Sequence, residues 1–375
     1  MKTIIRSLNL FVCAALLLGT AACEKDKPEE DSSKDKFLQT VNEQFVEKTV
    51  VATYKTLADK TLDLQEAFET LASNPTDANV LVACNLWKDS RKYWELSEAF
   101  LFGAASKYYI DPHIDTWPLD ATALNQLLNN DAMMEDIENV VANLNNGLVG
   151  FHGVEYIIFR EGQPRAAADI PAKELSYAVA VAKDLSLSCC RLEAAWAGMD
   201  KVTVEKREII EDAEMEPEDD FGEQMRLCGQ PGSLWKSVTA GSEQIIEGCK
   251  TIVDEVGNSK IGKPYTGEDI NYIESPHAYN SITDFYDNIV SVRNVYFGGL
   301  GLTAPAEYSL SSYIKSVDQK ADAEVIAAID NCLAKIQAMP APFVQNYTNP
   351  KVQDAIESCN TLNDALEAAR KVLLK

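Results

Sequence analysis

Histidine is scarce in this chain of 375 residues, which contains three, and none of them belongs to an HExxH motif. A zinc-peptidase helix of that kind is therefore excluded. No CxxC pair occurs either, which argues against cysteine zinc sites and redox motifs of that type. Asn-Gly and Asp-Gly turns between alternating apolar runs are missing as well, so a hairpin-rich β fold is not expected.

Positive charge is also in short supply. The chain has 34 Lys and Arg against 58 Asp and Glu, for a formal net charge of −24. Because phosphate contacts need clustered Lys and Arg, we expect no nucleic-acid partner. An acidic surface attracts cations or basic partners, although a solvated surface that keeps the protein soluble is the simpler explanation of the charge.

Long apolar runs are limited to the N-terminus. Lys2 and Arg6 precede the apolar stretch LNLFVCAALLL, which is too short to span a bilayer and is typical of an export signal. GTAAC follows and ends at Cys23, which resembles a bacterial lipoprotein cleavage site. We therefore predict a signal peptide at 1–22 and lipidation of Cys23. Ordinary cleavage after an A-x-A-like site is the alternative.

Residues 23–36 have almost no apolar content. The stretch EKDKPEEDSSKDK is charged and cannot bury a core, so we expect a disordered tether. Its acidic and lysine-rich character resembles signals that direct lipoproteins of Bacteroidetes-type bacteria to the cell surface. The predicted location is the cell envelope, with the protein anchored to the outer membrane on its periplasmic face or at the cell surface.

Cysteines beyond the signal segment are odd in number. Of the nine, Cys13 leaves with the signal and Cys23 takes lipid, so seven remain. We expect most of them to be buried as small apolar side chains. One or two disulfides are compatible with an oxidising compartment, but the pairing stays open. The seven are Cys84, Cys189, Cys190, Cys228, Cys249, Cys332 and Cys359.

Helical periodicity dominates the rest of the chain. Apolar residues recur at three- and four-residue steps, which predicts an all-α protein of two helix-bundle domains. We place the domains at 37–205 and 234–375, joined by an acidic segment at 206–233 without helix. One helix end in each half has a similar sequence, WELSEAFLFG in the first and IVSVRNVYFGG in the second. The two domains are therefore related by duplication, unless this similarity is due to chance. The main predicted helices are 36–72, 80–102, 121–128, 131–144, 171–197, 234–256, 281–296, 309–317, 322–339 and 352–374, with an ordered loop at 104–120.

The segment GFHGVE carries the first candidate site. His152 and Glu155 are three residues apart, so on a helix they share one face and are both able to ligate a metal. Alternatively, the carboxylate orients the imidazole, or the two residues only hydrogen-bond neighbouring helices. Gly150 and Gly153 leave this helix surface bare, which predicts close packing or ligand approach there.

Three further clusters are candidates. Trp87, Arg91, Trp94 and Glu98 form a helical stripe in which Arg91 pairs with Glu98 or with an anionic ligand. The rigid element Trp117-Pro118 lies between Asp115 and Asp120, and helix capping is the alternative explanation for these two carboxylates. The predicted helix 281–296 has a polar face formed by Ser281, Asp284 and Asn288, for which exposure to solvent is the simpler explanation. The candidate ligand-binding residues are Arg91, Trp94, Glu98, Asp115, Trp117, Ser281, Asp284 and Asn288. His113 and His277 each follow a proline and are expected at the surface.

Together these motifs resemble the imelysin-like family. The segments that carry the resemblance run in family order across nearly the whole mature chain, and GFHGVE fits the family signature G-x-H-x-x-E. His277 departs from the family, which more often has an aromatic residue there. The segments are WKDSRKYWELSEAFLFG, DTWPLD, GFHGVE, SPHAYNSITDFYDN, NVYFG and PAPF.

The resemblance implies a bacterial envelope protein with two helical bundles and a site at their junction. Founding members were called insulin-cleaving metallopeptidases, and others are iron-regulated. The leading hypothesis is a non-enzymatic lipoprotein that binds a metal ion or metal-containing ligand through His152 and Glu155, with iron or zinc as the divalent metal and iron-uptake envelope proteins as partners. A metallopeptidase using the same two residues is the alternative, and a purely structural or interaction module is the third.

Overall fold

The computed structural model describes residues 29–375, with side chains described from residue 33 onward. This part of the chain is helical almost throughout, and its one sheet is the antiparallel hairpin of β1 (Phe159–Arg160) and β2 (Gln163–Pro164). The predicted all-α class is therefore confirmed. None of the described helices has both the length and the apolar character needed to cross a membrane. The predicted signal peptide and Cys23 lie outside the described residues.

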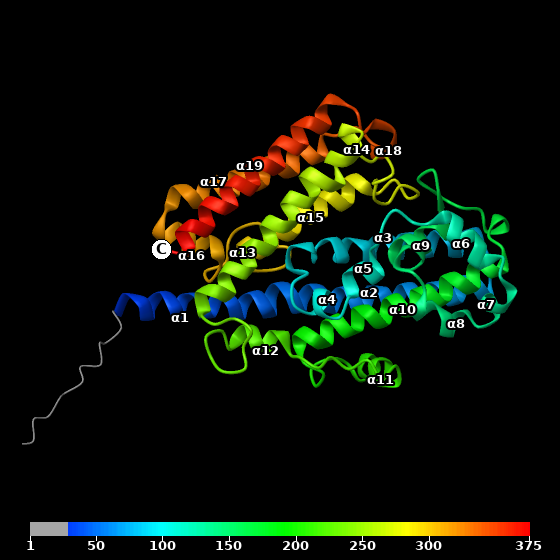
Figure 1. The fold of residues 1–375 in the computed structure, drawn as a ribbon, viewed down its shortest axis with the longest axis horizontal. Helices are drawn as coiled ribbons and strands as arrows, with labels where there is room; N and C mark the ends of the chain where they lie inside the picture. Colours follow the sequence, from blue (N-terminus) through cyan, green and yellow to red (C-terminus); the bar gives the residue numbers. More distant parts are fainter. Residues whose placement is uncertain (1–28) are drawn as a thin grey trace, which may run out of the picture.

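The N-terminal half is built on long helices. α1 (Glu29–Gln44) runs through the π-helical segment η1 (Phe45–Val50) into α2 (Val51–Ser73), which packs against α3 (Asp77–Glu95) and α10 (Ala172–Ala197) (Figure 1). Because α1 begins at Glu29, the last part of the predicted tether is helical. The shorter segments are η2 (Glu98–Phe100), α4 (Ala104–Lys107), α5 (Ile110–Ile114), α6 (Ala121–Leu128), α7 (Asp131–Glu135), α8 (Ile137–Val140), η3 (Val141–Asn143), η4 (Asn146–Leu148), α9 (Gly150–Ile158) and η5 (Ala167–Asp169).

The segment between the halves was expected to lack helix, and the structure corrects this. It contains α11 (Val204–Asp212) and α12 (Phe221–Arg226). The side chains of Thr203 and Asp220 accept hydrogen bonds from the backbone N–H groups of the first turns, so each helix starts at a proper N-cap. The predicted loop at 104–120 likewise contains α4 and α5. Pro112 lies in the first turn of α5, where a missing N–H is tolerated.

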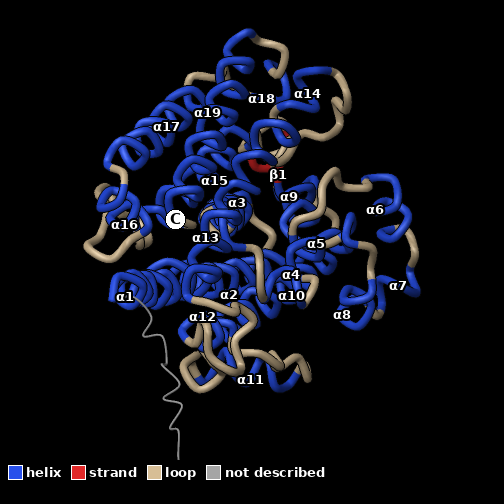
Figure 2. The backbone as a smooth tube through the Cα atoms, turned by 60° about the vertical axis from the view of Figure 1, so that its left-hand side comes forward, coloured by secondary structure: helices blue, strands red, loops and turns tan. Residues whose placement is uncertain are grey.

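The C-terminal half forms a second layer of helices. Figures 1 and 2 show α13, α15, α17 and α19 above the run of α1 and α2. α17 packs along α19, and α13 packs against both α15 and α19. The helices of this half are α13 (Val238–Asp254), η6 (Glu255–Lys260), α14 (Gly262–Thr266), α15 (Ser281–Phe297), α16 (Leu310–Val317), α17 (Gln319–Gln337), α18 (Phe343–Asn346) and α19 (Pro350–Leu373).

The two halves share one core. α1 packs against α13 and α16, while α3 packs against α15, so helices of each half contact helices of the other. The buried apolar side chains accordingly form one cluster that extends from Leu38 to Leu373. The sequence boundaries at 205 and 234 mark a connection in the chain, and the apolar core continues across them. The proposed duplication stays a prediction.

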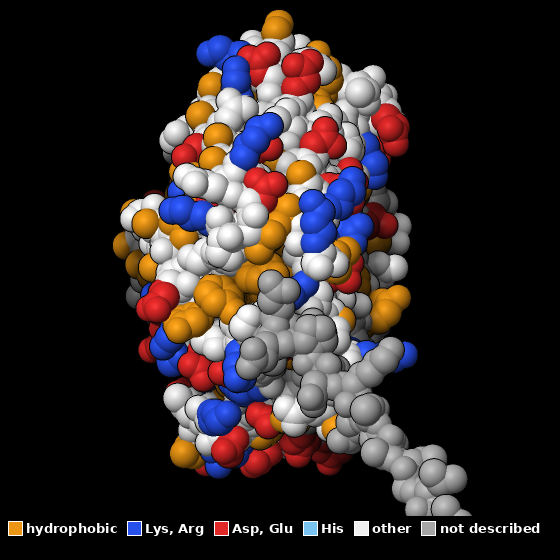
Figure 3. Space-filling model, turned by 90° about the vertical axis from the view of Figure 1, so that its left-hand side faces the viewer, with side chains coloured by type: hydrophobic (Ala, Val, Ile, Leu, Met, Phe, Trp, Pro, Cys, Tyr) orange, Lys and Arg blue, Asp and Glu red, His pale blue; other side chains and the backbone are white. Residues whose placement is uncertain are grey.

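Surface charge is mixed on the face shown in Figure 3. Lys and Arg side chains are interspersed with Asp and Glu there, and apolar side chains reach the surface between them. The acidic excess of the chain is therefore not gathered into one field on this face. Interspersed charges of both signs are what keeps a surface solvated without steering one class of partner.

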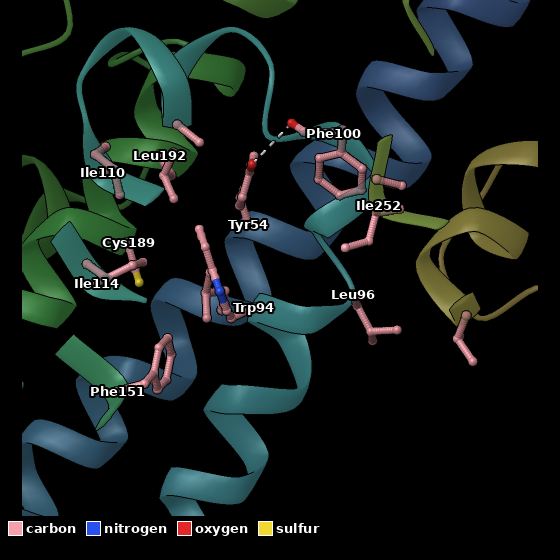
Figure 4. Packing of buried hydrophobic residues seen from close by; sticks show 14 of the residues in the cluster. Tyr54, Trp94, Leu96, Phe100, Ile110, Ile114, Phe151, Cys189, Leu192 and Ile252 are labelled. Carbon is pink, nitrogen blue, oxygen red and sulfur yellow. Dashed lines mark hydrogen bonds between the residues drawn. The ribbon is translucent and has the colours of Figure 1, made fainter. Parts of the chain in front are cut away.

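Apolar packing positions the backbone segments that carry the candidate site residues Asp115 and His152. Trp94 from α3, Ile114 from α5, Phe151 from α9 and Cys189 from α10 point toward one another in the core (Figure 4), and all four are fully buried. Burying a large apolar side chain stabilises the fold by about 1.5–3 kcal/mol. Ile114 and Phe151 directly precede Asp115 and His152, so this packing also sets where those polar side chains begin.

Gly150 allows the closest of these approaches. It has a φ of +70°, and a Cβ built on it would lie 2.1 Å from the carbonyl oxygen of Ile114. A Cβ on Gly153 would lie 2.5 Å from the hydroxyl of Tyr177. The bare helix surface predicted from these glycines is thus used for close packing, which brings the end of α5 against the start of α9.

Gly150→Ala tests this contact. We expect a loss of about 3 kcal/mol or more in the free energy of unfolding, because the new methyl group adds backbone overlap to the strain of a positive φ. Gly267→Ala is the matched control, since Gly267 has a φ of +76° with nothing within 4 Å of its built Cβ. Denaturant unfolding measures both variants. Equal losses would contradict the role of close packing.

Candidate functional site

The candidate site lies where the two halves of the chain meet. A cavity of about 680 Å³ opens there, and both predicted motif residues line it. His152 and Glu155 form its wall together with residues 117–120 of the N-terminal half. The C-terminal half contributes Ile270, Asn271, Ile273, Pro276, His277 and Val344. The predicted position of the motif at a junction between the halves therefore agrees with the geometry.

Glu155 holds both His152 and a loop of the opposite half. Nδ1 of His152 lies 2.9 Å from Oε2 of Glu155, so the ring N–H donates to the carboxylate. Oε1 of Glu155 accepts the backbone N–H groups of His277 and Ala278, each at 2.8 Å. With both carboxylate oxygens engaged, Glu155 orients the imidazole and leaves Nε2 for another partner.

His152 is 2% exposed and lies between two carboxylates. Its Nε2 lies 3.2 Å from Oδ1 of Asp115, which is an ion pair when the ring is protonated, although the contact does not have hydrogen-bond geometry. Burial alone lowers the pKa of His152, yet the neighbouring Asp115 and Glu155 outweigh burial and raise this pKa to about 9. The imidazole is therefore cationic at neutral pH unless another cation replaces its proton.

A buried guanidinium forms the centre of the polar cluster. Arg91 has no exposed surface, and its Nη2 lies 2.5 Å from Oε1 of Glu95 and 2.7 Å from Oε1 of Glu274. Nη1 contacts Oδ1 of Asp115, and Nε lies 3.8 Å from Oδ1 of Asp284. These partners come from α3, from the residue after α5, from the loop before α15 and from α15. Arg91 thus joins the two halves of the chain.

Glu98 is not the partner of Arg91, so the first of the two predicted pairings was wrong, whereas an anionic ligand of Arg91 stays a prediction. α3 ends at Glu95, and Glu98 begins the tighter turn η2, so the four-residue stripe does not continue on one helix. Glu98 instead faces Lys260, whose Nζ lies 3.9 Å from its Oε1. Helical spacing cannot be extended past the residue where a helix ends.

Lys260 is a second buried cation. Its Nζ lies 3.1 Å from Oε1 of Glu274 and 3.7 Å from Oε2 of Glu95. It also lies over the indole ring of Trp117, 4.9 Å from the ring centroid, which is a favourable cation–π position. The lysine therefore bridges the charged cluster and the Trp-Pro element that lines the cavity.

The polar face of α15 is buried, so the solvated alternative is not what the structure has. Ser281 donates to the backbone carbonyl of Glu274 at 2.6 Å, and Asn288 donates to Oε2 of Glu95 at 2.5 Å. Asp284 accepts from the side chain of Asn280 at 2.7 Å. All three predicted residues of this face therefore belong to the same cluster as Arg91.

Burial divides the carboxyl groups into two kinds. It raises the pKa of Asp284 and Glu98 well above the usual range and that of Glu274 to about 7. Burial acts in the same direction on Asp115, but Arg91 and His152 outweigh it and hold that pKa well below its usual range. A buried carboxylate without a paired cation is costly, so Asp284, Glu98 and Glu274 take up protons more readily than usual. Their protonation reduces the negative charge of the cluster.

Two groups of side chains in the described residues have the spacing of a metal site. The ligand atoms of Asp115, His152 and Glu274 lie within 4.8 Å of one another, as do those of Glu95, Glu98 and Asp115. In the first group, Nε2 of His152 and Oε2 of Glu274 are buried and make no hydrogen bond. Cations already face the carboxylates of both groups, since Lys260 lies near Glu95, Glu98 and Glu274 and Arg91 contacts Asp115 and Glu274. The first group differs in that it includes an imidazole nitrogen, which the second group lacks. The first group therefore fits a metal better.

All ten predicted site residues meet in this region. His152, Glu155 and Trp117 line the cavity, and the other seven lie in or against the charged cluster. Trp94 joins through its indole N–H, which donates to Oδ2 of Asp115 at 2.6 Å. Their roles in binding stay predictions. The seven are Arg91, Trp94, Glu98, Asp115, Ser281, Asp284 and Asn288.

The two other histidines have different surroundings. His113 lies 2.7 Å from Asp184 of α10 and is half-buried, so it links helices away from the cavity. His277 lines the cavity, but its contact with Glu155 uses the backbone N–H, and its ring packs edge-on against Tyr156. Neither imidazole belongs to the candidate metal group.

Three residues of the cluster escaped the sequence-based prediction. Glu95 is four residues after Arg91 on one helix, so an i,i+4 pairing rule would have found it. Glu274 stands directly before the SPHAYN segment, but no spacing rule connects it with His152. Lys260 has no local signal at all, because it is a single lysine at the end of η6, which only the tertiary structure brings beside Trp117.

The fold and site define a class of helical protein with a buried charged cluster beside an open cavity. A family model described as Imelysin, peptidase M75, matches residues 50–369. The chain therefore belongs to the imelysin family. It is 26% identical over 336 residues to iron-regulated protein A of Synechococcus elongatus, an alignment that covers 88% of this chain and 84% of that protein.

Solved structures agree with this assignment. A Parabacteroides distasonis protein, provisionally named iron-regulated protein A precursor, superimposes with a TM-score of 0.80 at 26% identity, covering 90% of this chain and 95% of that one. An imelysin-like protein from Psychrobacter arcticum has a TM-score of 0.59 at 13% identity, covering 90% and 93%, and shares the fold. The similarity to the first protein extends over nearly the whole of both chains.

Glu155→Gln tests the contact that orients His152. Removing the carboxylate charge should lower the pKa of His152 from about 9 by about one unit or more, because one of its two anionic neighbours is lost. Histidine NMR titration measures the change. His277→Gln is the control, since it keeps the backbone N–H that Glu155 accepts. An unchanged His152 pKa in Glu155→Gln would contradict the assignment.

Proposed function

We propose that this protein is a non-enzymatic, iron-linked binding protein of the cell envelope, which holds a metal ion or a metal-containing ligand at the junction of its two halves. The metal ligands are Nε2 of His152 and the carboxylates of Asp115 and Glu274. The observation that carries the proposal is the grouping of ligand atoms of Asp115, His152 and Glu274 within 4.8 Å of one another, with His152 in the cavity wall and Oε2 of Glu274 buried without a hydrogen-bond partner.

The donor set favours a transition metal. One imidazole nitrogen with two carboxylate oxygens suits Fe²⁺ or Zn²⁺, whereas Mg²⁺ and Ca²⁺ prefer oxygen alone. Glu155 supplies the supporting carboxylate that a metal-bound imidazole usually has on its other nitrogen. The relatives are named iron-regulated protein A, which links them to iron and makes iron the first metal to test here.

The cavity is larger than a metal ion needs. At about 680 Å³ it has the volume of a small-molecule pocket, and its walls carry Trp117, Ile273 and Val344. A metal held by a small organic chelator would fill this space with the metal toward His152. Both a free ion and such a complex are compatible with the same three ligands.

The peptidase alternative has less support. A metallopeptidase needs a carboxylate that is free to take a proton from the metal-bound water. Both oxygens of Glu155 are engaged, one with His152 and one with two backbone N–H groups. Chelator-sensitive cleavage of an unfolded protein that disappears in Glu155→Gln would nevertheless make the peptidase the better assignment.

Metal titration of the purified chain tests the proposal. We expect one Fe²⁺ or Zn²⁺ per chain, with proton release, because the metal displaces the proton on Nε2 of His152. His152→Ala and Glu274→Gln should each weaken binding by about tenfold to a hundredfold or more. Calorimetry under anaerobic conditions, with elemental analysis after dialysis, measures stoichiometry and affinity.

His277→Gln is the matched control for that titration. It changes a cavity residue whose imidazole is outside the candidate metal group, so binding should be retained. Thermal melts of every variant separate lost binding from lost folding. The assignment fails if the wild type binds Fe²⁺, Zn²⁺ and Cu²⁺ no better than buffer ions, or if His152→Ala binds equally well. Variants that lose only stability would indicate a structural module.

Anchoring through Cys23 completes the proposal. The expected site is the outer membrane, where iron-uptake proteins of the envelope are the expected partners. Cys23→Ala should move the protein from the membrane fraction to the soluble fraction and abolish its labelling by a radioactive fatty acid. Membrane attachment that survives this change would rule out the lipid anchor.

A further inference from the structure

Two buried thiols of the C-terminal half face each other. Cys332 lies on α17 and Cys359 on α19, and their sulfur atoms are 3.5 Å apart. Both side chains have at most 1% exposure. α17 and α19 pack along each other, and Figure 1 shows them side by side at the outer edge of the C-terminal layer.

This pair stands apart from the other cysteines of the described residues. The thiol of Cys84 contacts the backbone carbonyl of Ile158, and that of Cys228 contacts the sulfur of Met225. Within residues 29–375, Cys332 and Cys359 are the two cysteines whose sulfurs are in hydrogen-bonding contact with each other. Two thiols at this separation need only a small movement to reach bonding distance.

We propose that Cys332 and Cys359 form a disulfide when the chain folds in the presence of a disulfide oxidant, which cross-links α17 to α19. A disulfide has a sulfur–sulfur distance of about 2.05 Å, so the sulfurs must approach by roughly 1.5 Å. Side-chain rotation and a slight closing of the two packed helices supply a movement of that size. This inference is independent of the proposed metal binding.

The chemistry is thiol–disulfide exchange and needs an oxidised partner such as glutathione disulfide. The hydrogen bond from Cys359 lowers the pKa of Cys332, which favours Cys332 as the first thiolate. Its sulfur attacks glutathione disulfide and releases one glutathione thiolate. Cys359 then attacks the mixed disulfide and releases the second. The two protons pass to the glutathione thiolates, and two electrons pass from the protein to glutathione.

The cross-link would stabilise the part of the C-terminal half that forms one wall of the cavity. It joins residues 27 positions apart, and the enclosed segment contains α18, whose Val344 lines the cavity. A Cβ built on Gly257 would lie 2.8 Å from Cβ of Cys359, so Cys359 packs against η6, the segment that ends at Lys260. Closing this loop removes conformational freedom from the unfolded chain and thereby stabilises the fold.

Tryptic mapping gives a direct test, because each cysteine lies alone in its peptide. Trypsin releases 321–335 with Cys332 and 352–370 with Cys359. The purified chain is unfolded, refolded with glutathione disulfide, alkylated and digested. We expect one linked species of these two peptides, about 2 Da lighter than their sum. The midpoint of thermal unfolding should fall by about 5 °C or more when this sample is reduced.

Three variants control the mapping. Cys332→Ser and Cys359→Ser should each remove the linked species and the effect of reduction on the unfolding midpoint. Cys249→Ser changes another fully buried cysteine, on α13, and should leave both unchanged. Recovery of the two wild-type peptides as alkylated thiols, or linkage of either one to another cysteine, would overturn the proposal. The wild-type map decides even if a variant fails to fold.

Discussion

The buried charge of Arg91 is the constraint on which the junction depends. A guanidinium without any exposed surface requires partners for its charge and its N–H groups, and removing a partner from such a group typically costs about 3–5 kcal/mol. The partners here are Glu95, Asp115, Glu274 and Asp284, which come from both halves of the chain. Separating the halves would leave these charges uncompensated, so the junction and the cluster form together.

The site follows from this cluster and from the way Glu155 is used. Arg91, Lys260 and the protonated His152 compensate much of the negative charge, while Oε2 of Glu274 stays buried without a hydrogen bond. Glu155 fixes the imidazole and, through two backbone N–H groups, the loop that carries Glu274. Two of the three candidate metal ligands, His152 and Glu274, are therefore positioned by one carboxylate.

Sequence patterns identified much of this site because its residues lie on regular elements with unusual composition. Arg91 within an aromatic stripe, His152 three residues before Glu155, and the polar face of Ser281, Asp284 and Asn288 were each conspicuous. The predicted pairing of Arg91 with Glu98 was wrong, because a helical spacing was extended beyond the end of α3. The helices of the connecting segment were missed, because acidic, Pro-bearing sequence masks short helices whose caps decide them.

The sequence by itself determined the helical class, the amphipathic helices and the motif that marks the family, because periodicity and capping act over a few neighbouring residues. Only the tertiary structure decided that the halves share one core, that Glu274 and Lys260 join the cluster, and that Cys332 faces Cys359. These are contacts between residues far apart in the chain. No local pattern encodes such contacts, since they arise when apolar faces pack and buried charges must find compensation.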